Sequence, residues 1–301
     1  MSPFFKKTAL LIAGIVVLSA VAFVAFDKKD ETPIVPIEQV AEEAYRPEYK
    51  VIGKSVEGRK IESYTYVSAA AAESGEKKHL LFVGGVHGGY EWNSVVLAYE
   101  FVDYFNNNPD AIADNLVVTV IPSANPDGVY KIIGKEGRFS AEDVPADVDT
   151  APGRFNANNV DLNRNFDCEW KPESTWRGKT VSAGSEPFSE PEAKAVRDFV
   201  LQSNPKAVIF WHSQADAVYA SECKEGILAE TLDIMNLYAK ATGYKPVESF
   251  DHYEINGDAE GWLASIGIPA ITVELKTHET IEWERNLKGV KAIIDLFSRK
   301  P

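Results

Sequence analysis

Short apolar runs alternate with longer amphipathic stretches along most of the chain. Four apolar runs are short enough to be buried strands: residues 80–83, 116–121, 208–211 and 268–275. Stretches with apolar positions at helical spacing cover residues 92–105, 225–241 and 280–299. Strands that alternate with helices predict a three-layer α/β/α fold, in which helices cover both faces of a central mixed, mostly parallel sheet.

Local signals add detail at two places. Residues 49–53 and 61–67 flank a turn at Glu57-Gly58 and predict a hairpin ahead of the first buried strand. The sequence Ser189-Glu190-Pro191-Glu192 has the form of a capping box with proline in the first turn. It predicts that Ser189 caps the helix that follows.

The N-terminal part has a different pattern from the rest. Two lysines precede an apolar stretch at residues 8–26, and a charged, proline-containing stretch follows it. We expect a signal peptide or an N-terminal membrane anchor over residues 1–26, with both readings open. A linker over residues 27–44 and one folded domain over residues 45–301 would follow. The folded domain would then be exported to the periplasm, the medium or the outer face of the cytoplasmic membrane.

Length and charge limit the classes of partner. The 301 residues suffice for one large domain and a short appendage. The net charge of -14 argues against nucleic acid and anionic lipid surfaces, because both need basic patches. We expect a monomer without a nucleic-acid partner.

Histidine and glutamate side chains follow the predicted strands. His87 lies between two glycine pairs just after residues 80–83, with Glu91 four positions later, and His212 ends another apolar run. Glycines permit a sharp turn at the strand ends, where α/β sheets place their ligand sites. Glu274 ends a third apolar strand, where a carboxylate is costly unless it is paired or used. Nitrogen and oxygen ligands with a separate glutamate are typical of metal-assisted hydrolysis.

The run Asn163-Arg164-Asn165 supplies a planar cation between amide groups. A guanidinium in such a setting can hold a carboxylate with two parallel hydrogen bonds. Alone, the run is equally compatible with a buried arginine that joins loops.

Together these pieces resemble the zinc carboxypeptidases of the carboxypeptidase A type, including small bacterial relatives that trim cell-wall peptides. The resemblance extends from about residue 45 to the C-terminus. It rests on five pieces in order: Asn125-Pro126-Asp127-Gly128, Asn163-Arg164-Asn165, residues 186–192, His212-Ser213 and the strand that ends near Glu274.

The resemblance implies a catalytic centre with one Zn²⁺ per chain. Its ligands would be His87, Glu91 and His212. Glu274 would be the general base that takes a proton from zinc-bound water and delivers it to the leaving amine. Arg154 would polarise the scissile carbonyl and stabilise the developing oxyanion.

The resemblance also implies a substrate-binding set. Asn163 and Arg164 would hold the free C-terminal carboxylate, and Tyr253 would close over the bound substrate. Glu260 falls near the position that sets side-chain preference, with Asp258 as an equal contender. An acid there would favour a C-terminal lysine, arginine or diaminopimelate residue.

The first metal motif departs from the family pattern. Two residues usually separate its histidine and glutamate, whereas Gly88, Gly89 and Tyr90 separate His87 from Glu91 here. The glycine pair could absorb the extra residue; otherwise another oxygen would replace Glu91.

Export would give the two cysteines a role. Cys168 follows the Asn163-Arg164-Asn165 run, and Cys223 lies eleven residues after His212. Both would lie near the rim of the site, and we expect an oxidising compartment to join them by a disulfide.

The expected function is hydrolysis of the C-terminal bond of a peptide or muropeptide with a free C-terminus. Two alternatives use the same fold. One is a zinc amide hydrolase for non-peptide acyl amino acids, and the other is a non-catalytic binding module.

Overall fold

The computed structural model describes residues 47–68, 77–250 and 253–299. The expected signal peptide or anchor and the linker lie outside these residues, so they stay predictions. No helix in the described ranges is both long and apolar enough to cross a membrane.

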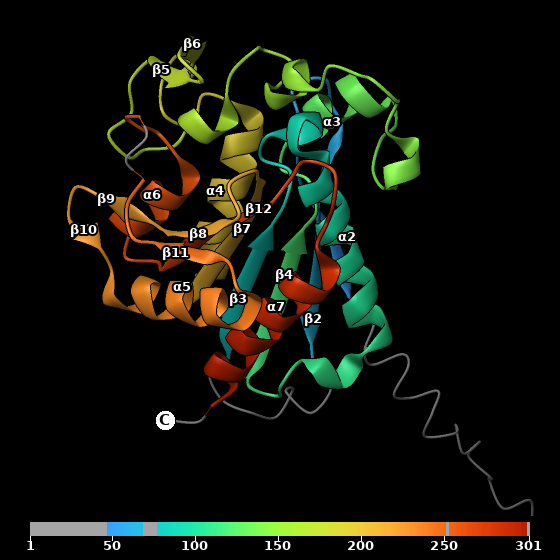
Figure 1. The fold of residues 1–301 in the computed structure, drawn as a ribbon, viewed down its shortest axis with the longest axis vertical. Helices are drawn as coiled ribbons and strands as arrows, with labels where there is room; N and C mark the ends of the chain where they lie inside the picture. Colours follow the sequence, from blue (N-terminus) through green and yellow to red (C-terminus); the bar gives the residue numbers. More distant parts are fainter. Residues whose placement is uncertain (1–46, 69–76, 251–252, 300–301) are drawn as a thin grey trace, which may run out of the picture. The chain divides into compact units, whose positions relative to one another are not determined.

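One sheet of eight strands, in the order β1-β2-β4-β3-β7-β12-β8-β11, forms the centre of the domain (Figure 1). The strands are β1 (Glu48–Lys54), β2 (Lys60–Val67), β3 (Lys78–Val83), β4 (Leu116–Ile121), β7 (Ala207–Ser213), β8 (Ala217–Ala220), β11 (Lys245–Val247) and β12 (Ala270–Leu275). Four neighbouring pairs are parallel, namely β4 with β3, β3 with β7, β7 with β12 and β8 with β11. The other three pairs are antiparallel. The predicted mixed, mostly parallel sheet is therefore confirmed.

Helices cover both faces of this sheet. The α-helices are α2 (Trp92–Asn107), α3 (Pro126–Ile133), α4 (Pro191–Ser203), α5 (Ala229–Thr242), α6 (Ala259–Ser265) and α7 (Trp283–Ser298). The 3₁₀ turns are η2 (Gly88–Glu91), η3 (Pro109–Ala111), η4 (Ala141–Asp143), η5 (Ala151–Arg154) and η6 (Leu162–Arg164). Two small hairpins pair β5 (Glu173–Trp176) with β6 (Lys179–Ser182), and β9 (Glu222–Cys223) with β10 (Gly226–Ile227).

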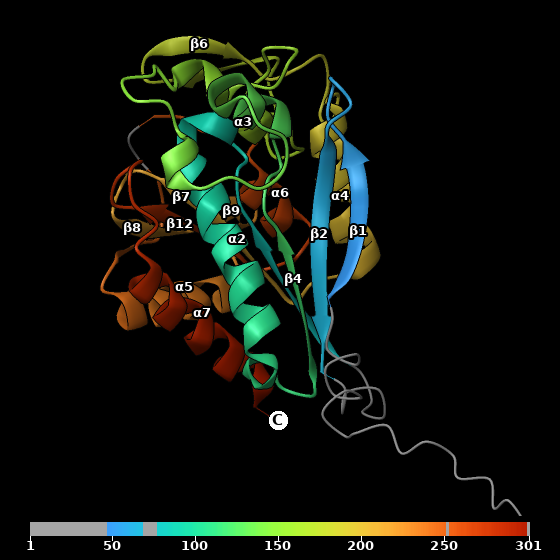
Figure 2. The same ribbon diagram turned by 90° about the vertical axis from the view of Figure 1, so that its right-hand side faces the viewer.

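Alternation along the central strands divides the core into two layers. On β7, Trp211 packs in the cluster formed with α2, α5 and α7, whereas Phe210 packs in the cluster formed with α4 and α6. Figure 2 shows α2, α5 and α7 on one side of the sheet and α4 on the other. The Trp211 ring lies between Phe82 and Phe101, at centroid distances of 5.5 and 4.9 Å. This packing fixes the strand that carries His212 near its C-terminal end.

Two local predictions need correction. Ser189 does not cap α4: the helix has Glu190 as its N-cap, without a side-chain capping bond. The Ser189 hydroxyl instead donates to Glu190 Oε1 and accepts a hydrogen bond from Asn165 Nδ2. The helix predicted over residues 225–241 begins later, at Ala229, because the preceding residues pair in the β9–β10 hairpin. The hairpin formed by β1 and β2 and the four buried strands are present as predicted.

Candidate metal centre and active site

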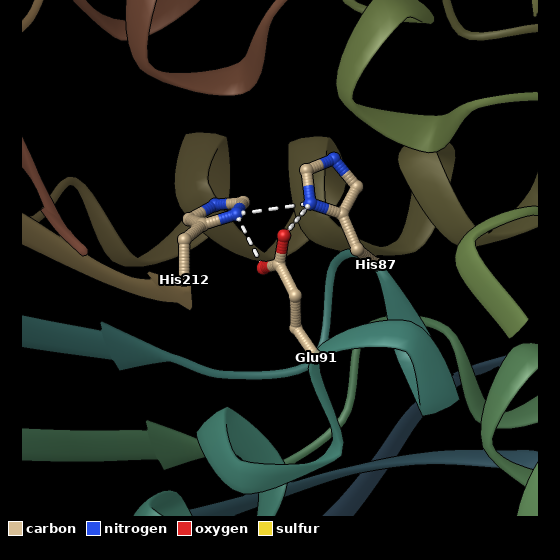
Figure 3. A group of neighbouring side chains, drawn as sticks. All are labelled: His87, Glu91 and His212. Carbon is tan, nitrogen blue, oxygen red and sulfur yellow. Dashed lines mark hydrogen bonds and ion pairs between the residues drawn. The ribbon is translucent and has the colours of Figure 1, made fainter. Parts of the chain in front are cut away.

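The structure brings His87, Glu91 and His212 together in a buried cluster (Figure 3). The Glu91 carboxylate lies between the two rings, with Oε1 at 2.8 Å from His87 Nδ1 and Oε2 at 3.0 Å from His212 Nδ1. The two Nδ1 atoms are 3.2 Å apart. Within the described part of the chain, this is the one group with the side-chain composition and spacing of a metal site.

The turn η2 absorbs the extra residue between His87 and Glu91. His87 immediately precedes η2 and Glu91 is its last residue, so one 3₁₀ turn returns the carboxylate to the imidazole. Gly88 has a positive φ of 47°, and a Cβ there would lie 2.7 Å from the carbonyl oxygen of Gly153. Glycine therefore allows η2 to approach η5 closely. The sequence predicted that the glycine pair could absorb the extra residue, and the structure shows that it does so by forming this turn.

The donor atoms fit a divalent cation such as zinc. Two Nδ1 atoms that face each other and the same carboxylate form a set of nitrogen and oxygen ligands around one point. Burial opposes ionisation of Glu91, but the charges of His87 and His212 hold its pKa well below the usual range. A buried carboxylate that stays ionised beside two imidazoles is suited to binding a cation.

Asp161 links the metal cluster to Arg154. Its Oδ1 lies 3.5 Å from His87 Nε2, and its Oδ2 accepts a hydrogen bond of 2.8 Å from Arg154 Nε. Burial alone would raise the pKa of Asp161, but the nearby Arg154 and His87 lower it. The sequence interpretation did not assign Asp161, although it lies two positions before Asn163 in the same motif. A carboxylate behind a ligand histidine orients the ring and increases its basicity.

Arg154 is placed by the Asn125-Pro126-Asp127-Gly128 motif. Asn125 caps α3 by accepting a hydrogen bond from the Gly128 N–H, and its amide donates to the Arg154 carbonyl oxygen at 3.2 Å. The guanidinium then lies beside the metal cluster, with Nη1 at 3.9 Å from Glu91 Oε1. This cation is positioned to face a negative charge that develops next to the cluster.

Glu274 lies on β12 opposite His212 on β7. Its neighbours Val273 and Leu275 pack into the apolar core, so the alternation of the strand directs Glu274 towards the other face. Its Oε2 atom is buried without a hydrogen-bond partner. Burial, followed by the charge of Glu91, raises the pKa of Glu274 to about 8. Such a carboxyl group can take up and release a proton near neutral pH.

Asn163 and Arg164 form the turn η6 and are both buried. Asn163 Oδ1 accepts a hydrogen bond of 2.9 Å from the Ala259 N–H, which ties η6 to the start of α6. Arg164 Nη1 donates to the Asn163 carbonyl oxygen, whereas its Nε has no partner. The guanidinium therefore retains donors for a ligand in the cavity.

The predicted metal, catalytic and substrate-binding residues all line one cavity of about 760 Å³. Tyr253 lies at its wall against Phe250, with ring centroids 4.8 Å apart. Glu260 Oε1 is 3.2 Å from His212 Nε2, so this acid contacts a candidate ligand in addition to lining the cavity. Asp258 caps α6 through the Gly261 N–H at 2.7 Å.

Cys168 and Cys223 are joined by a disulfide in the wall of the same cavity. Cavity residues that the sequence did not single out include Tyr90, Trp176 and Arg177. The sequence gives little indication of this hairpin, because its strands have only four residues each. Trp176 is the last residue of β5, and Arg177 lies in the two-residue turn that leads to β6.

Comparisons with known proteins agree with this geometry. A family model described as zinc carboxypeptidase matches residues 37–283. The chain is 27% identical over 169 residues to gamma-D-glutamyl-L-diamino acid endopeptidase 1 of Lysinibacillus sphaericus, covering 52% of this chain and 42% of that protein. It is 30% identical over 170 residues to carboxypeptidase B of Astacus astacus, covering 54% and 52%. The chain thus spans about half the length of these curated relatives.

The fold is also found in a solved structure. That of thrombin activatable fibrinolysis inhibitor matches with a TM-score of 0.68 at 22% identity, over 87% of this chain and 72% of the other. At this identity the match shows a shared fold. Since the family model spans most of the sequence, the chain belongs to the zinc carboxypeptidase family.

Proposed function

We propose that this protein is a zinc carboxypeptidase that removes the C-terminal residue from peptides. The observation that carries the proposal is the placement of Arg164 in the same cavity as the His87, Glu91 and His212 cluster. A peptide whose terminal carboxylate binds the guanidinium would have its last peptide bond near the metal cluster.

The chemistry is divided between the metal and the side chains around it. A bound zinc would supply Lewis acidity, which activates water and polarises a carbonyl group. Glu274 Oε2 would accept the proton of the attacking water and pass it to the leaving nitrogen. The Arg154 guanidinium would stabilise the negative charge on the carbonyl oxygen. Asp161 holds Arg154 in place through its hydrogen bond to Nε.

Substrate binding would use the last two residues of η6 and the cavity wall. Arg164 would hold the terminal carboxylate with Asn163 beside it. Tyr253 would close over the leaving residue and limit the entry of water.

Two acids that line the cavity suggest a substrate with a basic C-terminal side chain. Asp258 and Glu260 both line the cavity, and an amine would relieve the repulsion between them. The relative from Lysinibacillus sphaericus is named for a diamino acid substrate. We therefore include lysine, arginine and diaminopimelate residues of cell-wall peptides among the proposed substrates.

Export is part of the proposal. It rests on the lysines and the apolar stretch at residues 8–26. A catalytic domain outside the cytoplasm would meet cell-wall peptides directly.

The proposal can be tested by incubating the zinc-loaded protein with a mixed pool of peptides and muropeptides. Mass spectrometry should show loss of single C-terminal residues, and the Glu274→Gln variant should show none. Cleavage at internal bonds only, or equal products from both proteins, would contradict the proposal. The residues released would reveal the side-chain preference directly.

A further inference from the structure

The β5–β6 hairpin presents an arginine at its tip. Trp176 pairs with Lys179, so Arg177 and Gly178 form a two-residue turn. Their φ angles are 50° and 74°, and a turn with two positive φ angles favours Asn, Asp or Gly at its first position. Arginine is costly there. The turn alone therefore gives no reason for this side chain.

The tip of the hairpin is fixed beside the candidate catalytic residues. The Trp176 ring is buried, with the Arg154 guanidinium 4.8 Å from its centroid. It also meets the Tyr90 ring edge-on at 5.2 Å. Figure 1 shows the hairpin at the end of the sheet towards which β3 and β4 point. These contacts anchor Arg177 next to the site.

Arg177 itself is exposed and lines the cavity. No ion pair between described residues involves it. Its guanidinium forms a side-chain hydrogen bond with Tyr90. The guanidinium therefore lies beside the Tyr90 side chain, and the N–H groups that this bond does not use are available to a ligand in the cavity.

The three arginines of the cavity follow an order. Arg154 Nε donates a hydrogen bond to Asp161, the N-cap of η6, and Arg164 is the last residue of η6. The same Arg154 guanidinium lies 4.8 Å from the centroid of the Trp176 ring, and Trp176 immediately precedes Arg177 in the hairpin. Arg154 therefore contacts both η6, which carries Arg164 and is tied to α6, and the hairpin that carries Arg177. Under the proposed function, Arg164 holds the leaving residue and Arg154 faces the scissile carbonyl. Arg177 then faces the acyl side of the bond.

We propose that Arg177 binds a carboxylate carried by the residue that contributes the scissile carbonyl. The assignment to the acyl side rests on the proposed function, whereas the anion site itself does not. Two sources offer this chemistry: an aspartate or glutamate side chain, and the free α-carboxylate of a γ-linked glutamyl residue. Asp258 and Glu260 line the same cavity. The cavity would therefore favour a substrate with an anionic residue on the acyl side of the scissile bond and a cationic leaving residue.

Three variants separate this role from the structure of the hairpin. Arg177→Asn removes the guanidinium and installs a residue that the turn favours, so it should fold at least as well. Arg177→Lys keeps the charge without the planar fork. Lys179→Gln removes a charge from an exposed position of the same hairpin that does not line the cavity. It is the matched control.

The test measures binding by calorimetry, with each variant combined with Glu274→Gln and loaded with zinc. One peptide pair ends in Glu-Lys or Gln-Lys, and the other has γ-D-glutamyl-lysine with its α-carboxylate free or amidated. The anionic member of at least one pair should bind about five- to tenfold more tightly to the parent. Arg177→Asn should abolish that preference, Arg177→Lys should restore part of it, and Lys179→Gln should leave it intact. The affected pair identifies the source of the carboxylate.

Equal affinity within both pairs, including no binding at all, would overturn the inference. So would a preference that survives in Arg177→Asn. Hydrolysis by the protein with Glu274 intact tests the proposed function separately. Cleavage of the neutral peptides without an anion preference leaves the proposed function standing, whereas an Arg177-dependent preference without cleavage leaves only the anion site.

Discussion

Glu274 and His212 occupy paired positions on the neighbouring parallel strands β12 and β7. The separation of a candidate base from a candidate metal ligand is therefore set by a sheet, whose strands lie about 4.8 Å apart. His87 and Glu91 come from a turn at the end of β3, the strand on the other side of β7. The side chains at the carboxyl ends of three adjacent strands, β3, β7 and β12, thus meet at one site.

This arrangement predicts that Glu274→Gln separates metal binding from catalysis. The substitution keeps the shape of the side chain but removes its ability to accept a proton. Zinc content, measured by mass spectrometry of metals, should stay at one per chain, while kcat should fall by about 10²- to 10⁴-fold. His212→Ala should instead lose zinc. An active Glu274→Gln variant, or full zinc content in His212→Ala, would refute the respective assignment.

The bridge formed by Asp161 predicts a second effect on the metal. Asp161→Asn would remove the charge beside His87 Nε2 and weaken the hold on Arg154. Zinc affinity, measured by competition with a chelator, should fall by about 10- to 100-fold. Asp147→Asn makes the same chemical change at an exposed loop position and is the control. Unchanged zinc affinity in Asp161→Asn would show that the carboxylate does not support the ligand.

Asp258 predicts a dependence of specificity on pH. Burial, followed by the charge of Glu260, raises the pKa of Asp258 from 3.8 to about 6. The group is neutral at about pH 5 and ionised at about pH 7, so the preference for C-terminal lysine over glutamine should grow across that range. Ratios of kcat/KM at each pH would measure it. Asp258→Asn retains a residue suited to capping α6 and should show no such change.

The same pKa shift has a consequence for stability. A carboxyl whose folded pKa exceeds its unfolded pKa binds more protons in the folded state between the two values. The Asp258 contribution to the free energy of unfolding should therefore fall as pH rises from about 4 to about 6. Denaturation of the parent and of Asp258→Asn at several pH values should show this difference. The opposite slope would contradict the raised pKa.

Much of the architecture could be predicted from the sequence. The buried strands are visible as apolar runs because both faces of a largely parallel sheet are covered. His87, His212 and Glu274 follow or end three of these runs, and parallel strands bring their ends to one edge. The positions at strand ends indicated a shared edge, and the family resemblance was needed to assign these residues to one site.

Other features depend on contacts that local patterns do not encode. Ser189 has the sequence of a helix cap, but its hydroxyl is engaged by Asn165 from a distant loop. Glu260 was expected near the position that sets side-chain preference, and its approach to His212 arises only when α6 packs against β9 and β12. Arg177 does not indicate a turn, because its positive φ is a conformation in which Asn, Asp or Gly is usual. Tertiary packing decided each of these positions.

The disulfide between Cys168 and Cys223 supports the substrate-binding side of the cavity. The loop that holds Cys168 pairs with Gly257, since the Phe166 N–H donates to the Gly257 carbonyl oxygen and the Gly257 N–H donates to that of Cys168. Gly257 adjoins the start of α6, and the Phe166 loop adjoins η6. The bridge, between residues 55 positions apart, thus secures both segments against β9.

Replacing both cysteines by serine should lower the free energy of unfolding by about 2 to 4 kcal/mol. It should also raise KM more than it lowers kcat, because Arg164 loses support while the metal cluster does not. Thermal denaturation and steady-state kinetics would measure the two effects. Reduction with dithiothreitol should reproduce them in the parent and leave the double variant unchanged. An unchanged melting temperature after complete reduction would show that the hydrogen bonds through Gly257 suffice without the bridge.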